Sequence, residues 1–217
     1  MDSTDVLRVV TGSAILGDTL FHLPSGGLFE GGGLRYFTPE PIWALSGAST
    51  VAFGINSTYR IGLYGSDGAL ERIISRPSEP KLITERDIRA FFAYLDRAWL
   101  ANGVPPARLA ANHAAVRFAE FLPTFSTLQA GPQGTLWVQP VQAPGELSDE
   151  AIERYDFIEQ FGATGWEVFD PEGRFMGTVT MPPRFQPRVF KGDAIYGVAR
   201  DEFDVQYVVR LRILVPR

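Results

Sequence analysis

The chain has 217 residues, a formal net charge of −5, 45% hydrophobic residues and 21% charged residues, which is typical of a globular protein with material for a sizeable core. It contains no cysteine, so disulfides, thiolate nucleophiles and cysteine metal sites are excluded. The acidic balance, with Lys81 and Lys191 as the only lysines, disfavours nucleic acid as a partner, and no apolar run reaches the ~18 residues of a membrane span.

The N-terminal part of the chain predicts two strands, at residues 6–10 and 14–22, followed by a glycine-rich loop. The opening MDSTDVLRVV lacks the basic and apolar regions of a signal peptide. The loop at 26–33 lacks the Gly-Lys-Ser/Thr of a phosphate-binding loop and does not open a helix, so it is interpreted as a flexible connection.

Residues 61–74 and 166–179 repeat one pattern of strand, turn and strand. When IGLYGSDGALERII and WEVFDPEGRFMGTV are aligned on Gly68 and Gly173, their apolar positions coincide. Glycine adopts positive φ at little cost in a turn, and alternating β-branched and aromatic residues are typical of half-buried strands. Each segment therefore predicts a β-hairpin.

A short apolar strand, a glycine turn and a second strand precede each hairpin, so the repeated unit has four strands, A to D. SGASTVAFGIN and GPQGTLWVQPV carry the turn twice, and KGDAIYGVARD begins a third unit that continues into FDVQYVVRLRILV. Such repeats are typical of β-propeller blades, because each blade buries its faces against its neighbours. The predicted fold class is therefore all-β, with about three to four antiparallel propeller blades in a partial ring; the alternative is a β-sandwich with incidental glycine turns.

Four motifs carry a resemblance to a known family: LYGSDGALERIISRP, LPTFSTLQAGPQGTLWVQ, WEVFDPEGRFMGTVTMP and GDAIYGVARDEFDVQYVVRLRI. In these motifs the chain resembles the bacterial six-bladed β-propellers related to the NHL and TolB-like propellers, from about residue 39 onward. It departs from the family where Gln133-Gly134 stands in place of Asp-Gly, and Tyr64-Gly65 in place of Tyr-Asp. The resemblance implies a fold and no particular activity, because no catalytic set defines the family.

The predicted ring is incomplete. About 13 strands are expected, whereas six four-stranded blades need roughly 24, and the last unit lacks strand D. We interpret residues 1–217 as one partial propeller domain, the C-terminal part of a longer protein; a chain that pairs with a second copy and an unusually small ring are the alternatives. Missing blades or a second chain are then the expected partners of the open blade edges. Because members of the family are commonly exported, a periplasmic or secreted location follows if the true start is missing.

Two insertions, at residues 80–122 and 140–164, interrupt the strands. The first predicts a helix that Thr84 caps, and a second helix that runs from Pro106 to about Ala119. The first helix has an apolar stripe typical of core packing, formed by Ile88, Phe91, Phe92, Leu95 and Trp99. In the second insertion, Ser148 predicts the start of a short helix, and the acidic residues predict a solvated surface.

Strand parity places both insertions on one face. Loops from D to the next A and loops from B to C leave an antiparallel blade at the same end. The turn at 199–205 is also a B–C loop, so it is expected at the same end as the two insertions. The tight glycine turns fall at the opposite end. Insertions gathered on one face mark a binding face, so we expect a small molecule or a protein to bind there, and the apolar stripe to pack against the blades.

The best polar cluster is RDEFD at 200–204. The candidate ligand-binding residues are this cluster and a glutamine from the preceding unit: Arg200, Asp201, Glu202, Asp204 and Gln129. The three carboxylates are suited to calcium, the one cofactor that this turn allows for, or to a solvated turn with an internal ion pair. No metal site is assigned. His22 and His113 have no evident acid or nucleophile partner and are interpreted as structural.

Two functions are compatible with these features. The first is a non-enzymatic binding or scaffold propeller of an envelope or extracellular protein. The second is a metal-dependent hydrolase of the lactonase kind, which needs carboxylate and amide oxygens from several blades near the central channel. The acids of 193–204 come from one blade only, so the binding module is the preferred hypothesis.

Overall fold

The computed structural model describes residues 5–10, 17–23, 34–46, 50–201, 203 and 205–213, with the first two of these segments described as backbone only. Strands make up more of this part of the chain than helices do. β1 (Asp5–Val10) and β2 (Gly17–Leu23) pair antiparallel, and the short strands β3 (Leu34–Tyr36) and β8 (Val116–Phe118) pair in parallel. The glycine-rich loop predicted at 26–33 lies outside the described residues.

Three antiparallel sheets follow one another along the chain, each a simple meander. The first sheet contains β4 (Pro41–Ser46), β5 (Thr50–Ile55), β6 (Arg60–Tyr64) and β7 (Leu70–Ser75). The second sheet contains β9 (Phe125–Ala130), β10 (Leu136–Pro140), β11 (Gly165–Phe169) and β12 (Phe175–Thr180). The third sheet contains β13 (Phe185–Lys191), β14 (Ala194–Arg200) and β15 (Gln206–Arg212). The predicted four-strand unit is therefore confirmed twice, and its first three strands are confirmed a third time.

The two aligned hairpins have the same geometry in different sheets. Gly68 and Gly173 have φ values of 77° and 78°. In both turns, the backbone N–H of the residue three positions before the glycine donates to the carbonyl of the residue directly after the glycine. The N···O distance is 3.0 Å in each turn. Both registers also shift by one residue at the end of the first strand, beside Tyr64 and Phe169. The predicted equivalence of the hairpins is thus confirmed.

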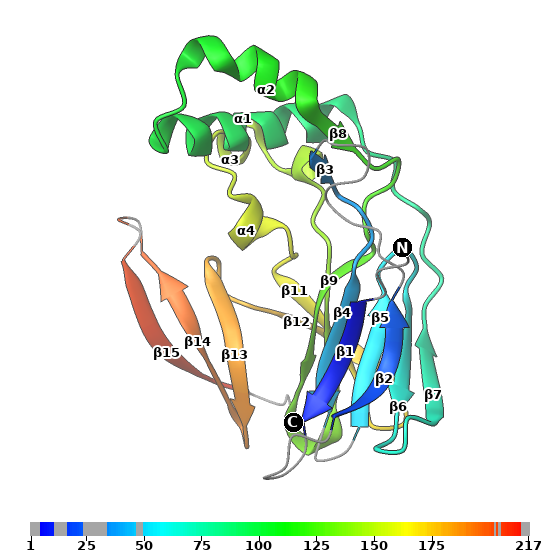
Figure 1. The fold of residues 1–217 in the computed structure, drawn as a ribbon. Coiled ribbons are helices and arrows are strands. Elements are labelled where there is room, and N and C mark those ends of the chain that lie inside the picture. The colour runs from blue at the N-terminus through cyan, green and yellow to red at the C-terminus, as the bar shows by residue number, and fades with distance from the viewer. Residues whose placement is uncertain are drawn as a thin grey trace.

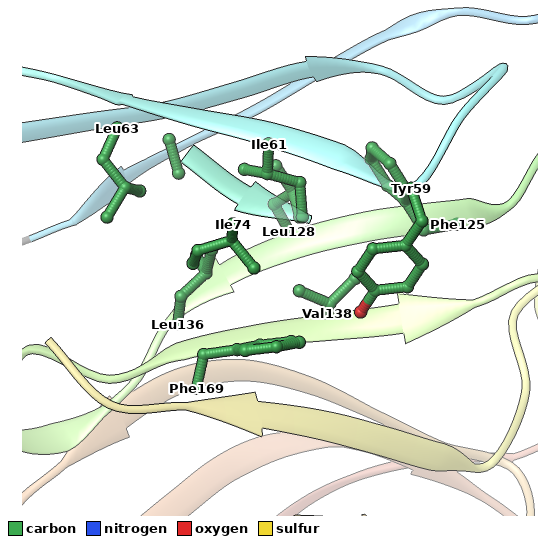
Figure 2. Packing of buried hydrophobic residues seen from close by; sticks show 10 residues of the cluster. Tyr59, Ile61, Leu63, Ile74, Phe125, Leu128, Leu136, Val138 and Phe169 are labelled. Carbon is green, nitrogen blue, oxygen red and sulfur yellow. The ribbon is translucent and has the colours of Figure 1, made fainter. Parts of the chain in front are cut away.

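The sheets stack face to face in chain order. Side chains from the first and second sheets interdigitate in one buried cluster (Figure 2), whose members are Ala52, Tyr59, Ile61, Leu63, Ile74, Phe125, Leu128, Leu136, Val138 and Phe169. A second cluster joins the opposite face of the second sheet to the third sheet, through Trp137, Trp166, Val168, Phe185 and Ile195. The first strands of the first two sheets, β4 and β9, lie side by side.

Asn56 fastens the first sheet to the second. It lies in the turn between β5 and β6 and is only 3% exposed. Its Nδ2 donates to the carbonyl of Phe125 at 2.8 Å, and its Oδ1 accepts the N–H of Glu40 at 2.6 Å. Asn56 is the first residue of Asn-Ser-Thr, which fits the N-glycosylation sequence. Its side-chain amide is nevertheless buried and hydrogen-bonded through both its oxygen and its nitrogen. The asparagine is therefore a structural residue, in the turn where the repeat places it.

We predict that Asn56→Ala lowers the free energy of unfolding by roughly 2–4 kcal/mol, because the buried Phe125 carbonyl and the part-buried Glu40 N–H each lose a partner, at about 1–3 kcal/mol for a buried group. Urea denaturation measures the change. The control is Thr58→Ala, which removes the glycosylation sequence at an exposed position and should stay within about 0.5 kcal/mol of wild type. Equal losses in the two variants would contradict the structural role of Asn56.

The first insertion contains a long helix, a short helix and a strand. α1 (Glu85–Ala101) begins with a capping box between Thr84 and Asp87, which confirms the predicted start. After a 3-10 turn at 106–108, α2 (Leu109–Ala115) ends earlier than the predicted Ala119, because β8 leaves it to pair with β3. Among the described residues, no helix is long and apolar enough to cross a membrane.

The second insertion contains a 3-10 turn at 144–146 and the short helices α3 (Asp149–Glu153) and α4 (Phe157–Gln160). The Ser148 hydroxyl accepts the N–H of Ala151 at 3.2 Å, which confirms the predicted cap. Asp149 and Glu150 are solvated, as predicted, and Asp149 also pairs with Arg86 of α1 at 2.6 Å. The two insertions are therefore tied to each other.

The two insertions and β3 share one aromatic core, which we call the cap. Its buried residues are Phe37, Phe91, Leu95, Val116, Leu122, Val141, Ala143 and Tyr155. The stripe of α1 was expected to pack against the sheets; instead Phe91 packs on Tyr36 of β3, Phe118 of β8 and Phe157 of α4. Figure 1 shows the helices at the end where β14 and β15 connect, opposite the hairpin turn of β6 and β7. The predicted common face of the insertions is thus confirmed, while the partner of the stripe is not the predicted one.

Candidate functional site

A partly buried ion pair joins the cap to the third sheet. Arg200, the last residue of β14, contacts Glu159 of α4 through its guanidinium, and the carboxylate side chain is the less exposed of the two. The sequence predicted that the acids of the second insertion are solvated. Glu159 is an exception to this prediction, because its carboxylate contacts Arg200 at the end of β14. The pair fixes the position of α4 relative to the turn that follows Arg200.

The Asp201 carboxylate holds that turn together. Its Oδ1 accepts the N–H groups of Phe203 at 2.9 Å and Val205 at 3.0 Å, and its Oδ2 accepts the hydroxyl of Tyr207 at 2.9 Å. Arg184 donates to the backbone carbonyl of Asp201. Desolvation acts to raise the pKa of Asp201, but these hydrogen bonds and the Arg184 charge outweigh it and lower the pKa from its ordinary 3.8. The carboxylate is therefore already used in shaping the turn.

We predict that the turn loosens only in strong acid. Because the pKa of Asp201 in the folded chain lies below its unfolded value, the hydrogen bonds persist at neutral pH and are lost as the pH falls through that lowered pKa. The amide shifts of Phe203 and Val205, followed by NMR, should titrate with a midpoint below 3.8. Asp201→Asn should abolish this titration. A midpoint at or above the ordinary value would contradict the assignment.

Exposed apolar side chains flank the ion pair. Ile158 of α4 is 76% exposed and Phe203 of the turn is 79% exposed. Val205 and Tyr207 are also exposed. We call the surface formed by Ile158, Glu159, Arg200, Asp201, Phe203, Val205 and Tyr207 the rim. Large exposed apolar side chains gathered beside charged ones are typical of contact surfaces.

The structure brings only part of the predicted site together. Arg200 and Asp201 lie in the rim, whereas Glu202 and Asp204 lie outside the described residues. Gln129 is near the glycine-turn end of β9, where its Nε2 donates to the Arg188 carbonyl at 2.7 Å and links the second sheet to the third. Within the described part of the chain, no group of three or more His, Asp or Glu side chains is placed to hold a metal ion.

His113 has an acid partner that the sequence analysis missed. Its Nε2 lies 2.6 Å from Oδ1 of Asp96, and its ring stacks on Phe92 with centroids 4.1 Å apart. The pair joins α2 to α1 across 17 residues of sequence. No sequence pattern predicts a contact between residues that far apart, so the partner could not be identified from the sequence. The contact supports the structural interpretation of His113. His22 lies in β2, whose side chains are outside the description.

A second buried tie lies between the first two sheets. The Tyr59 hydroxyl donates to Glu167 Oε2 at 2.5 Å, and Arg76 pairs with the other carboxylate oxygen. Burial is the main cause of a strongly raised pKa at Tyr59, and the hydrogen bond to Glu167 adds to it. Tyr59 therefore stays a neutral donor across the accessible pH range, and its role is to align the sheets.

No protein-family model matches this sequence, and no curated protein matches it closely enough to count as a relative.

Proposed function

We propose that the three stacked sheets are consecutive blades of a β-propeller of the six-bladed kind. Three features support this. Each sheet is a meander in chain order, the sheets stack face to face, and the first strands of the first two sheets lie side by side, as first strands do around a central axis. The repeated hairpin geometry at Gly68 and Gly173 adds that the units are equivalent.

We further propose that the chain is a binding module whose partner docks on the rim. The observation that carries this proposal is the exposure of Phe203 and Ile158 beside the ion pair of Arg200 with Glu159. The pair holds two separate elements in register, so the apolar side chains are displayed on a preorganised frame. Preorganisation reduces the entropy lost on binding.

The charge of the rim indicates the chemistry of the partner. The segment 200–204 contains one arginine and three carboxylates, and Glu159 adds a fourth. The expected partner is therefore a protein segment that combines an apolar side chain with positive charge, because complementary charge steers association and an apolar anchor provides most of the affinity. The hydrolase alternative gains no support from the described residues, since Asp201 already accepts three hydrogen bonds within its own turn.

Site-specific photocrosslinking in cells of the source organism tests this proposal. A photoreactive phenylalanine analogue at Phe203 should give a discrete crosslinked product, and Arg200→Ala in the same chain should weaken it by loosening α4. The matched control places the analogue at Met176, an exposed residue of β12 away from the rim. The proposal fails if position 203 gives no product, or if position 176 gives the same one.

A further inference from the structure

The sheets of this chain stack in a fixed direction. In each sheet we call the face toward the sheet that follows in the chain the forward face, and the other the backward face. The forward face of the first sheet packs on the backward face of the second, and the forward face of the second packs on the backward face of the third. One type of interface is thus used twice within the chain.

The forward face of the third sheet repeats this surface without a neighbour. Strand register makes Ile61, Trp166 and Val208 equivalent positions on the third strand of each unit. Ile61 is 0% exposed and Trp166 is 2% exposed, but Val208 is 85% exposed. Tyr196, which corresponds to the buried Trp137, and Val189 of β13 are exposed on the same face. The third sheet therefore presents three large apolar side chains to solvent on its forward face, beside Arg210 and Arg212 of the same strand face.

The backward face of the first sheet is open in the same way. Trp43 of β4 corresponds to Leu128 of β9. Each pairs with a residue of the second strand of its own sheet, and those two partner residues occupy the same position in the repeat. Leu128 is 5% exposed, whereas Trp43 is 47% exposed. A shallow hollow of about 240 Å³ lies on this face, with Phe53, Tyr64 and Ile73 in its lining. In the part of the chain with described side chains, the backward face of the first sheet is therefore partly open.

Charge at the two open faces is complementary. Arg210 and Arg212 lie on β15 toward the glycine-turn end, where Asp193 pairs with both. Asp67 and Glu71 lie at the glycine-turn end of the first sheet. The existing interface has a similar contact, because Arg72 of the first sheet donates to a carbonyl in the hairpin of the second. Stacking the third sheet on a first sheet, with the glycine turns at one end, would bring opposite charges together.

We propose that a second copy of this chain covers both open faces. The forward face of the third sheet in each copy packs on the backward face of the first sheet in the other. The two junctions are identical, so two copies close a ring of six sheets and leave neither face exposed. The interface continues the series that the chain already builds internally, and it uses surfaces away from the rim.

Light scattering coupled to size-exclusion chromatography tests this proposal across a concentration series. The wild-type chain should have about twice the 24.0 kDa mass of one chain. Val208→Asp and Trp43→Glu should each raise the dissociation constant by about 100-fold or more, because each variant introduces a charge into both junctions. The control is Met176→Asp on β12, which should leave the dimer intact. Circular dichroism checks that every variant is folded.

Mixing the two variants distinguishes head-to-tail stacking from a face-to-face dimer. A mixed pair has one junction with both original side chains, while the two acidic replacements meet in the other junction. Dimer should therefore return when Val208→Asp and Trp43→Glu chains are combined, held by the one intact head-to-tail junction. A wild-type monomer at every concentration would mean that a different protein or a further segment covers these faces, and would overturn the proposal. A dimer that survives Val208→Asp would overturn it equally.

Discussion

Replacing Phe125 with alanine should lower the free energy of unfolding by about 3–5 kcal/mol, the usual range for a fully buried phenylalanine. Phe125 is 0% exposed at the start of β9, between the first and second sheets. Its ring lies beside that of Tyr59, and its tip lies 3.2 Å from the point where a Cβ on Gly54 would be. Because a glycine cannot extend into the vacated space, the cavity should stay largely open.

The matched control for this variant is Phe203→Ala, since Phe203 is a phenylalanine of the rim that is almost fully exposed. Its loss should stay within about 0.5 kcal/mol. Guanidinium denaturation followed by tryptophan fluorescence measures both changes. A loss below about 1 kcal/mol for Phe125→Ala would show that the first two sheets do not share a packed core.

A second large effect is expected in the cap. Phe91 is fully buried, with ring centroids 4.5 Å from Tyr36, 5.0 Å from Phe37 and 5.0 Å from Phe157. Phe91→Ala should cost about 3–5 kcal/mol. Because the buried cluster of the cap is distinct from those between the sheets, the loss should fall mainly on the cap.

Hydrogen exchange provides the measurement for the Phe91 variant. Amides of α1 should lose protection while those of β5 and β10 keep it, since only the cap loses packing. Leu100→Ala, at an exposed position of the same helix, is the control and should change neither set. An equal loss of protection in α1 and in the sheets would mean that the cap and the sheets unfold as one unit.

Local signals explain why the sheets could be predicted from the sequence. The hairpins at Gly68 and Gly173 combine strand alternation with a glycine in a turn that needs positive φ, and both features act within a few residues. The start of α1 is equally local, because Thr84 and Asp87 are three residues apart. The register and the common face of the insertions then follow from strand parity.

The parts that could not be predicted depend on contacts between distant residues. β3 and β8 are three-residue strands about 80 positions apart, too short to show any periodicity, and their pairing changed both the end of α2 and the partner of the α1 stripe. The pair of Glu159 with Arg200 is likewise absent from any local pattern. Of the rim residues, the sequence analysis therefore identified Arg200 and Asp201 through RDEFD, whereas the contribution of α4 is visible only in the fold.

The central claim is that α4 and the turn after β14 form one surface, opposite the glycine turns. Distances between spin labels test it most directly, and the absence of native cysteine makes the labelling specific. Labels on cysteines at Ile158 and Phe203 should lie closer together than labels at Ile158 and Glu172, which is in the hairpin turn at the far end of β11. The opposite order of distances would contradict the rim and the function proposed for it.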